Sequence, residues 1–491
     1  MFLIKLVYKM NFLTKSLFFS IIIFQIIILS CKKDDDFLTD GDAKLNFSAD
    51  LVTFDTIFTT VSTSTRQITV YNPQNQRIKI SSIRLANGNQ SYFSLNINGM
   101  ATNSATNVEI EAKDSIFIFI KANINPNNQN NPLLVTDSII FETNGNIQDI
   151  DIVACGQDAH FIIADKTIGN QLKYKIVAKQ GEIITWNNDK PYVIYGYAVI
   201  DSTAKLTINA GCRIYLHKNS GVWVYKGGNI KVLGTYNEPV TFQGDRREAW
   251  YANATGQWDR IWINEGNEEN EINYAIIKNG FIGIQTEILG ETPMAKNKLK
   301  LTNTIIKNMS GYGIYSRNFE IDATNNVISG CGLYSVYLSL GGKYNFVHNT
   351  IANYWNGSNR NTPAVYISNF FNTNYTTYLN DLNATFGNCI ITGNQTEELE
   401  FDKNSEVSFV TKFDHCIIKT SLNDATFEDC LRNVDPLFKS QENENFNIYS
   451  DSPAKNTGNP IYGTIAPVDI RQFSRDGQPD IGAYEYDVNS P

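Results

Sequence analysis

Histidine is scarce in this chain, and several patterns that carry enzyme chemistry are missing from it. Only four of the 491 residues are histidine, so a histidine-rich metal centre is not expected. The sequence holds no GxSxG, HExxH or P-loop pattern, and therefore lacks the local signatures of serine hydrolases, zinc proteases and nucleotide-binding enzymes. No CxxC pair occurs either, which argues against a zinc knuckle.

Basic residues are also outnumbered by acidic ones. The chain has 41 Lys and Arg against 50 Asp and Glu, a net charge of −9. An acidic balance without a basic stripe excludes the electrostatic footprint of a nucleic-acid-binding protein. The loops of the repeat described below carry Asn, Ser, Thr and Tyr more than Asp or Glu, so no calcium ladder or catalytic carboxylate pair can be identified. We expect no metal and no cofactor.

No apolar run is long enough to cross a membrane. The longest, from Leu17 to Leu29, has 13 residues, whereas a spanning helix needs about 20. Lysines precede it and Ser30-Cys31 follow it, which is typical of a cleaved export signal over residues 1–30. The stretch ILSC resembles the lipobox of bacterial lipoproteins. That resemblance implies that Cys31 is acylated and anchors the mature chain in outer-membrane lipid.

The charged segment KKDDD follows Cys31 and predicts a solvated tether over residues 31–42. It resembles the acidic export signal of surface-exposed lipoproteins in bacteroidete-type bacteria, which implies a position on the outer face of the outer membrane. The six remaining cysteines are too sparse for a disulfide scaffold, so we expect free buried thiols.

Alternating apolar and polar residues fill residues 43–157. Stretches such as RQITVYN, RIKISSIRL and FSLNING have a period of two and are separated by Asn, Gly and Pro turns, a pattern that favours an antiparallel β-sandwich. The stretch VYNPQNQRIKISSIRLANG resembles the opening of immunoglobulin-like domains of the abnormal-spindle/Hydin type. Such domains are mainly spacers or binding modules, so this part implies no catalysis.

An internal repeat runs through the second half of the chain. Its cores include NYAIIKNGFIGIQ, TNTIIKNMSGYGIYS and TNNVISGCGLYSVYL. The second apolar residue of each core is Ile277, Ile306, Ile328, Ile351, Ile391 or Ile418. The steps between these residues are 29, 22, 23, 40 and 27. A step near 22 is one coil of a parallel β-helix, and longer steps indicate inserted loops.

The repeat resembles the parallel β-helix repeat family, and LTINAGCRIYL resembles the irregular first coils of right-handed β-helices. Coils stack about 4.8 Å apart, so Ile306 should lie in an interior row, and Cys389 and Cys416 should stack as free thiols. The predicted fold is all-β: an N-terminal β-sandwich at 43–157, a right-handed parallel β-helix at 158–434 and a capping module at 435–491.

The C-terminal stretches NIYSDSPAKNTGNP and DIRQFSRDGQPDIGAYEY resemble the terminal module of bacterial β-helix surface proteins with an SPA…DIGAYE signature. A solenoid has an open apolar end that would recruit other strands. We expect Ile481, Tyr484 and Tyr486 to cover that end, and Asp469, Arg471 and Asp480 to pair around its rim. The alternative is a ligand site at residues 484–486.

Charged and aromatic residues crowd the stretch GDRREAWYANATGQWDRIW. Four of the six tryptophans, counting Trp223, lie within 40 residues, and such a row could form a stacking platform for sugars. The candidate glycan contacts are Asp245, Arg246, Arg247, Trp250, Trp258, Asp259, Arg260 and Trp262. The alternative is that Trp258 and Trp262 close the first coils and that the charges form a solvated rim.

These patterns predict a monomeric, surface-anchored lipoprotein whose β-helix displays a binding face for polysaccharide, without catalysis. Two alternatives stay open on the sequence. One is a polysaccharide lyase or glycoside hydrolase acting at the tryptophan-rich coils, for which a lyase base would need a lowered pKa. The other is an adhesin or a structural spacer. No catalytic residue can be named.

Overall fold

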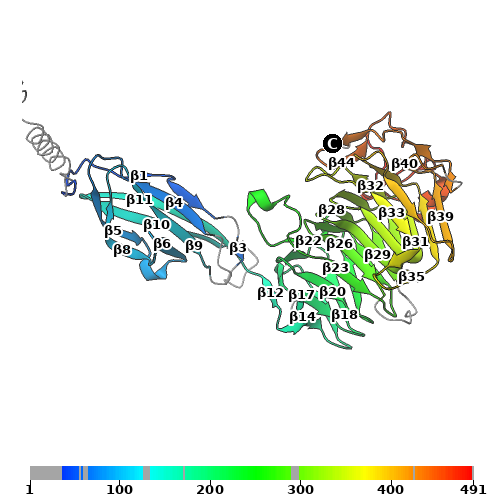
Figure 1. The fold of residues 1–491 in the computed structure, drawn as a ribbon, viewed down its shortest axis with the longest axis horizontal. Coiled ribbons are helices and arrows are strands. Elements are labelled where there is room, and N and C mark those ends of the chain that lie inside the picture. The colour runs from blue at the N-terminus through cyan, green and yellow to red at the C-terminus, as the bar shows by residue number, and fades with distance from the viewer. Residues whose placement is uncertain are drawn as a thin grey trace, which may run out of the picture. The chain divides into compact units, whose positions relative to one another are not determined.

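The chain is almost entirely β-structure (Figure 1). The computed structural model describes residues 36–54, 57–58, 65–124, 133–169, 172–288, 298–423 and 426–488; Cys31 and the predicted export signal lie outside them. Two compact units are present, the first ending at Gly156 and the second beginning at Gln157. No helix in the described ranges is long and apolar enough to cross a membrane.

The first unit is a sandwich of two sheets. One sheet has the order β1 (Asn46–Phe47), β4 (Arg66–Tyr71), β9 (Ser115–Ala122), β6 (Phe93–Ile97), β7 (Met100–Ala101). The other has the order β2 (Leu51–Thr53), β11 (Asn146–Gln157), β10 (Leu133–Thr143), β5 (Ile78–Leu85), β8 (Ser104–Ile110), and β3 (Ile57–Phe58) pairs with β11. In β9, Ile116, Ile118 and Ile120 are buried while Phe117 and Phe119 are exposed, because side chains alternate between the two faces of a strand.

The second unit is a parallel β-helix built from three strand ladders. Ladder A consists of β12 (His160–Ile163), β16 (Tyr192–Tyr195), β19 (Arg213–Leu216), β22 (Val240–Gly244), β25 (Ala275–Lys278), β28 (Ile305–Met309), β30 (Val327–Cys331), β32 (Thr350–Asn353), β37 (Ile390–Gly393), β40 (Ile417–Ile418) and β42 (Leu431–Arg432). Ladder B consists of β14 (Leu172–Ala178), β17 (Tyr197–Ile200), β20 (Gly221–Val224), β23 (Ile261–Asn264), β26 (Ile282–Glu287), the first parts of β29 (Tyr312–Thr324) and β31 (Val336–Val347), β33 (Val365–Ser368) and β38 (Leu399–Asp402).

Ladder C completes each coil. It consists of β15 (Ile183–Trp186), β18 (Lys205–Asn209), β21 (Asn229–Leu233), β24 (Asn270–Asn273), β27 (Lys298–Thr302), the later parts of β29 and β31, β36 (Leu382–Gly387), β39 (Phe409–Asp414) and β41 (Phe427–Glu428). Antiparallel additions are β13 (Lys166–Ile168) on β14, the hairpin β34 (Phe370–Asn372)–β35 (Thr377–Leu379), and the hairpin β43 (Phe438–Ser440)–β44 (Asn445–Ile448). The short α3 (Pro460–Ile465) follows.

The predicted interior register is confirmed. Strand pairing in ladder A places the six repeat isoleucines in one continuous row, Ile277, Ile306, Ile328, Ile351, Ile391 and Ile418. Each of them is 0% exposed. Apolar residues therefore recur at one position per coil because each must fill the same slot in a stacked core.

From the corner between β24 and β25 onward, seven corners that lead from ladder C to ladder A turn on one left-handed residue. These residues are Tyr274, Asn303, Asn325, His348, Asn388, His415 and Asp429, with φ between 47° and 55°. Asparagine tolerates this region better than other non-glycine residues. The residue after each of these corners points inward. In two successive coils that residue is Cys389 and then Cys416, and the backbone N–H of Cys389 donates to Cys416 Sγ at 3.3 Å. Both are buried free thiols, as predicted.

The C-terminal segment packs against the side of the β-helix. Ile470, Ile481 and Ala483 share an apolar cluster with Ile390 and Ile417, which face outward because their neighbours Ile391 and Ile418 face the core. At the last coil the residues that pack against the core are Leu422, Phe427 and Cys430, which are partly buried and belong to that coil itself. The prediction that Ile481, Tyr484 and Tyr486 cover the open end is therefore wrong.

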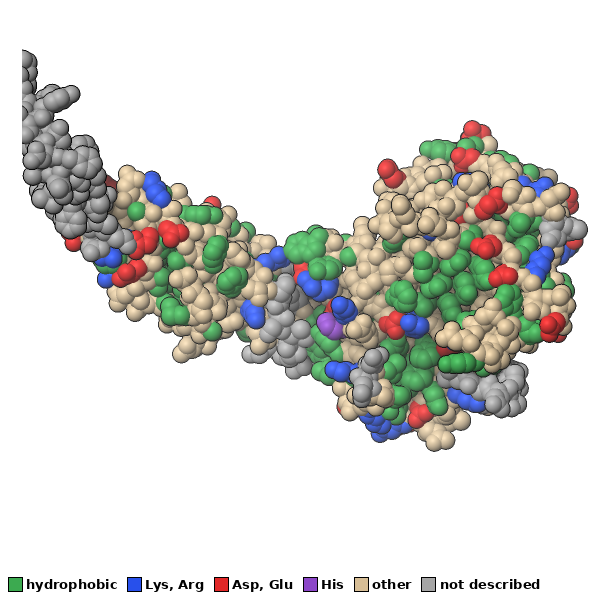
Figure 2. Space-filling view, in the orientation of Figure 1, with side chains coloured by type: hydrophobic (Ala, Val, Ile, Leu, Met, Phe, Trp, Pro, Cys, Tyr) green, Lys and Arg blue, Asp and Glu red, His purple; other side chains and the backbone are tan. Residues whose placement is uncertain are grey.

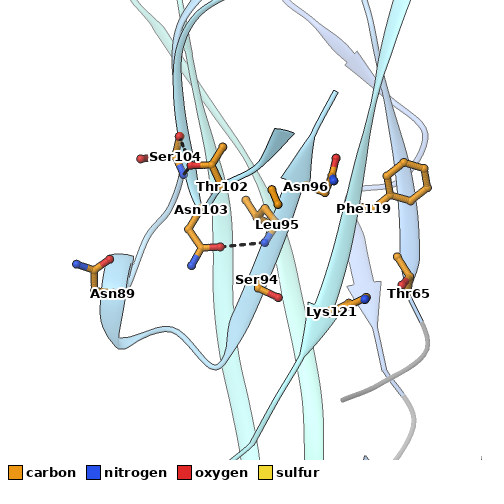
Figure 3. Close-up of a pocket in the computed structure, with 11 residues that line it drawn as sticks. Thr65, Asn89, Ser94, Leu95, Asn96, Thr102, Asn103, Ser104, Phe119 and Lys121 are labelled. Atoms are coloured by element: carbon orange, nitrogen blue, oxygen red, sulfur yellow. Dashed lines mark hydrogen bonds between the residues drawn. The ribbon is translucent and has the colours of Figure 1, made fainter. Parts of the chain in front are cut away.

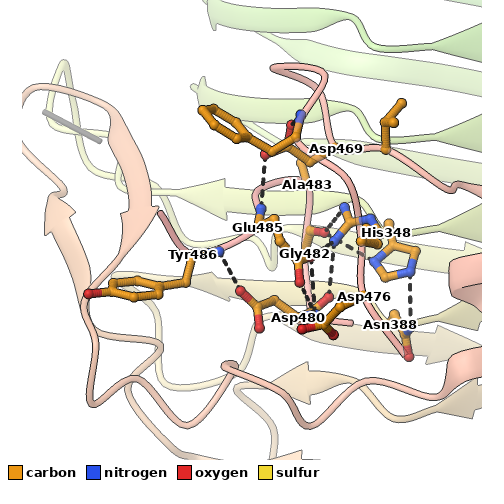
Figure 4. A network of polar contacts seen from close by, with 12 residues as sticks. His348, Asn388, Asp469, Asp476, Asp480, Gly482, Ala483, Glu485 and Tyr486 are labelled. Atoms are coloured by element: carbon orange, nitrogen blue, oxygen red, sulfur yellow. Dashed lines mark hydrogen bonds and ion pairs between the residues drawn. The ribbon is translucent and has the colours of Figure 1, made fainter. Parts of the chain in front are cut away.

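A buried polar network fastens this segment to the corner of ladders C and A (Figure 4). Arg475 donates to Glu485 Oε2 at 2.7 Å, to Asn325 Oδ1 at 3.2 Å and to the Gly482 carbonyl at 2.9 Å. The Gly482 N–H donates to the Asn388 carbonyl at 2.8 Å. Asp469 pairs with Arg471 at 3.0 Å, and Asp480 accepts from backbone N–H groups of the same segment.

Acid should weaken this attachment through His348. Burial and the charge of Arg475 hold the His348 pKa well below its usual range, and neutral Nε2 accepts from Asn388 Nδ2 at 3.0 Å. The unfolded chain takes up this proton below about pH 6.5, so the His348 contribution to stability is present above that pH and is lost as the pH falls. We expect the His348→Gln variant to lose less stability than wild type when the pH falls from about 6.5 to about 4.5, as measured by thermal unfolding.

Glu485 changes the pH dependence of stability in the opposite direction to His348 and provides the control. Burial, together with the charge of Asp480, raises the Glu485 pKa to about 7. The folded state keeps this proton while the unfolded state releases it near pH 4.3, so stability falls as the pH rises towards 7. Glu485→Gln should therefore lose more stability than wild type on acidification over the same range. Equal pH profiles for wild type and both variants would contradict the assignment.

Candidate functional site

The structure divides the predicted glycan contacts into three groups. Trp258 is 1% exposed and belongs to the core, and its Nε1 donates to the Lys278 carbonyl at 2.8 Å. Its ring is therefore not part of the surface. The second group, Asp245, Arg246, Arg247 and Trp250, lies in the loop between β22 and β23. In the third group, Trp262 lies in β23 of ladder B, and Asp259 and Arg260 lie just before that strand.

The β22–β23 loop supplies partners for its own charges. Asp245 Oδ2 lies 2.7 Å from His217 Nδ1, and Arg246 forms an ion pair with Glu248 at 2.6 Å. The guanidinium of Arg247 lies 5.3 Å from the centre of the Tyr215 ring. Trp250 is 61% exposed. These contacts hold the loop in place rather than gathering its residues into a pocket.

The outer face of ladder B carries an extended row of aromatic residues, which we call the aromatic strip. One column contains Trp223, Trp262, Tyr315, Tyr337 and Tyr366, aligned in register with Gln285 between Trp262 and Tyr315. Phe281, Tyr312 and Tyr334 lie beside this column and contact it or one another. Figure 2 shows hydrophobic side chains gathered over these strands, with acidic and basic groups between them.

The two parts of the strip present different ring surfaces. Tyr337 stacks on Tyr315 at 5.1 Å and on Tyr366 at 4.7 Å, with planes within 9° of parallel. Stacked rings turn their faces to each other, so only their edges and hydroxyls reach solvent. Tyr312 stands at 81° to Tyr315 and at 13° to Tyr334. Tyr312 and Tyr334 are themselves a stacked pair with ring centres 5.8 Å apart, so each can offer only its outer face to a ligand.

A buried carboxylate holds the tryptophan end of the strip. Glu287 accepts from Trp262 Nε1 at 2.7 Å and from Gln285 Nε2 at 2.9 Å, and it forms an ion pair with Arg317. Asp259 accepts from the Tyr197 hydroxyl and from Arg260. Glu287 thus orients the Trp262 indole, whereas Trp223 Nε1 donates to Asn264 Oδ1 at 2.6 Å. The charged groups leave a polar border along the rings.

Protonation states on the strip favour hydrogen-bond donation. Burial raises the pKa of Tyr315 and of Tyr334 to about 12, so both phenols keep their protons at neutral pH. Burial also lowers the pKa of Arg317. The ion pair with Glu287 nevertheless stabilises the charged form of Arg317, which makes it a poor general base. Within the described ranges no group of three His, Cys, Asp or Glu could hold a metal ion.

The tyrosine half of the strip was missed by the sequence reasoning. Its signal is present in GIYS, SVYL and AVYI, where Tyr315, Tyr337 and Tyr366 each follow an interior residue of the second strand. The sequence prediction used the row of interior residues and not the second column formed by the residues that follow them. An outward column is detectable once the inward one is known, because successive side chains alternate.

The first unit has a pocket of about 850 Å³ beside β6, β7 and β9 (Figure 3). Its lining residues are Thr65, Asn89, Ser94, Leu95, Asn96, Ala101, Thr102, Asn103, Ser104, Phe119 and Lys121. Asn103 Oδ1 accepts from the Leu95 N–H at 2.9 Å and so satisfies the edge of β6. With one ring and one charge in its lining, this pocket offers less for recognition than the strip.

Comparison with known proteins supports the β-helix and little else. Residues 178–276 match the family of pectate-lyase-like β-helix domains, a match that includes Trp223, Trp262 and the β22–β23 loop. No curated protein matches the chain. The match to the domain family covers the first coils, so it identifies the type of scaffold and not its ligand.

Similar solved structures cover only parts of the chain. The ASH/PapD-like domain 7 of human CEP192 is 10% identical over 24% of this chain and 87% of that chain, with a TM-score of 0.18. The periplasmic chaperone SfaE is 14% identical over 23% and 58%, with a TM-score of 0.17. A family 123 glycoside hydrolase from Clostridium perfringens is 11% identical over 30% of each chain, also at 0.17. Scores this low carry no argument about function.

Proposed function

We propose that this protein is a surface-anchored lipoprotein whose β-helix binds a glycan along the aromatic strip without transforming it. The observation that carries the proposal is the extent of the strip, which runs in register from Trp223 to Tyr366. Trp223 and Gln285 are buried, so a polymer lying across the coils would meet the partly exposed members of the column on strands stacked about 4.8 Å apart. These members are Trp262, Tyr315, Tyr337 and Tyr366. The match to pectate-lyase-like domains favours a carbohydrate as the polymer.

The chemistry of the strip suits a sugar. A pyranose ring has an apolar face of C–H groups and a rim of hydroxyls. The outer faces of the stacked rings Tyr312 and Tyr334 can take the C–H groups, while protonated phenols and the side chains of Asp259 and Arg260 can bond the hydroxyls. Binding without reaction is proposed because the one arginine of the strip with a lowered pKa, Arg317, is already paired with Glu287.

Removing the two ring faces should abolish most of the binding. In Tyr312→Ala with Tyr334→Ala, the loss of two aromatic contacts of about 0.5–1.5 kcal/mol each should weaken glycan affinity about tenfold or more. Titration calorimetry against a polysaccharide panel measures this. Tyr375→Ala is the matched control, because Tyr375 is 96% exposed on the β34–β35 hairpin. Equal losses in both variants would contradict the proposal.

The same panel separates binding from catalysis. Unsaturated products or new reducing ends that disappear in Arg317→Lys would establish the lyase or hydrolase alternative instead. A protein that binds no polysaccharide but retains a protein partner would favour the adhesin or spacer alternative. We further propose that the first unit is an immunoglobulin-like spacer between Cys31 and the β-helix.

Anchoring rests on Cys31. In Cys31→Ser the acyl chains should be absent, because the serine hydroxyl cannot be acylated in place of the thiol. The protein then loses the membrane affinity of these chains, about 0.8 kcal/mol per buried CH₂. Fractionation of cells should then move the protein from the membrane to the soluble fraction. Cys155→Ser is the control, since this thiol lies in the sandwich. Membrane retention of Cys31→Ser would exclude lipid anchoring.

A further inference from the structure

A second recess lies on the outer face of ladder A, beside the docked C-terminal segment. It consists of a pocket of about 690 Å³ and a neighbouring pocket of about 430 Å³. Both are lined by Tyr354, Asn394 and Gln441, so they form one continuous groove. We call it the amide groove.

Three parts of the second unit build this groove. Outward residues of successive ladder A strands form the floor, among them Lys307, Ser329, Ala352 and Thr392, which pairing places in one column. The β43–β44 hairpin forms one wall, and the loop after β32 forms the other. The floor runs from β28 to β40, four strand spacings or about 19 Å. That length suits a short polymer segment better than a single small molecule.

Side-chain amides dominate the lining. They belong to Asn253, Asn279, Asn308, Asn356, Asn394, Gln441 and Asn443. Each amide has two N–H donors and an oxygen acceptor, and a hydroxyl likewise donates and accepts. Asn279, Asn308 and Asn394 use part of this capacity within the protein, and the exposed amides of Asn253 and Asn356 face a ligand. Tyr354, Trp355 and Phe446 add aromatic surface to the same walls. Amides and rings together match a ligand that carries hydroxyls around apolar C–H faces.

Charges in and beside the groove cancel. Lys307 is paired with Glu444 at 2.6 Å, and Glu444 also accepts from Ser329 Oγ at 2.9 Å. The other charged lining residues are Lys419, Asp435 and Glu442, and Lys278 lies beside Lys307 in register. An anionic polymer would therefore meet carboxylates as well as lysines, which removes the usual electrostatic gain.

We propose that the amide groove is a second saccharide site, selective for an uncharged oligosaccharide. It lies on ladder A, whereas the aromatic strip lies on ladder B, and the two share no residue. The proposal goes beyond strip binding and does not depend on it. Two sites on one solenoid would let the protein hold a polysaccharide, or two of them, with the added strength of bivalent attachment.

Testing the groove requires a protein in which saccharide binding to the aromatic strip has been removed. The experiment uses the full chain with Tyr312→Ala and Tyr334→Ala as background, and titration calorimetry with maltohexaose, cellohexaose, mannohexaose and xylohexaose as uncharged probes. Hexagalacturonate and a neutral Gly/Ser decapeptide test the other ligand classes. At least one uncharged hexasaccharide should bind this background protein, and more tightly than hexagalacturonate or the peptide.

Two exposed amides can be removed without disturbing the fold. Asn253 and Asn356 are exposed and come from two different loops of the lining, so Asn253→Ala with Asn356→Ala should keep the melting temperature. Losing their hydrogen bonds should weaken binding about tenfold. Asn383→Ala, exposed on ladder C, should change nothing. Absence of binding by every uncharged probe, tighter binding of hexagalacturonate or the peptide, or equal effects of the groove and control variants would overturn the proposal.

Discussion

Glu398→Ala should lower the free energy of unfolding by about 3–5 kcal/mol, as expected when one partner of a buried ion pair is removed. Glu398 and Arg360 have side chains that are 0% and 1% exposed, and they form two hydrogen bonds of 2.6 and 2.9 Å. Glu398 also accepts from the backbone N–H groups of Ala364 and Gln395. The variant would leave a buried guanidinium, the buried Ala364 N–H and the partly buried Gln395 N–H without their acceptor.

The loss should have a functional consequence as well. Arg360 donates to the carbonyls of Asn353 and Thr362, so the Arg360–Glu398 pair holds the loop that carries Trp355 and forms one wall of the amide groove. We expect chemical denaturation to show the lower stability and hydrogen exchange to show early opening of residues 354–364.

Two controls separate the ion pair from general damage. Glu400→Ala removes an exposed carboxylate two residues further along β38 and should cost less than about 0.5 kcal/mol. Glu398→Gln keeps an acceptor of the same shape and should lose less than Glu398→Ala. If Glu398→Ala unfolds at the denaturant concentration of wild type, the pair does not stabilise this loop.

Arg475→Ala should release the C-terminal segment from ladder A while the coils remain folded. The variant loses the contacts of Arg475 to Asn325, Gly482 and Glu485, a buried set whose removal should cost about 3 kcal/mol. Glu485 would stay protonated at neutral pH without the guanidinium, so the main loss is in hydrogen bonds and packing. The apolar surface of Ile390 and Ile417 would then become accessible.

Limited proteolysis and hydrogen exchange distinguish local release from global unfolding. Residues 436–488 of Arg475→Ala should be cleaved and exchange quickly, whereas the Ile306 row stays protected. Arg475→Lys keeps the charge but not the forked geometry and should show an intermediate effect. Because the β43–β44 hairpin is one wall of the amide groove, groove binding should fall in parallel while strip binding persists. Cooperative loss of the whole β-helix would contradict the lateral attachment.

Periodicity in the sequence determined the β-helix and its register. Each coil must present the same kind of residue to the same interior slot, so the requirement is repeated along the chain and appears as the row from Ile277 to Ile418. The alternation in the first unit predicts its sandwich for the same reason, since a period of two follows from the geometry of one strand. The predicted stacking of Cys389 and Cys416 also needed only the register.

Tertiary structure alone decided what lies outside the coils. Arg475 reaches Asn325 across 150 residues and Gly482 contacts Asn388 across 94, and no local pattern encodes which solenoid surface an appended segment will cover. The tryptophan cluster was divided in the same way, because Trp258 turned inward at a corner while Trp262 turned outward on a strand. Interior positions obey a repeated constraint that the sequence displays, whereas the strip, the groove and the docked segment depend on contacts between surfaces that form only after the coils have stacked.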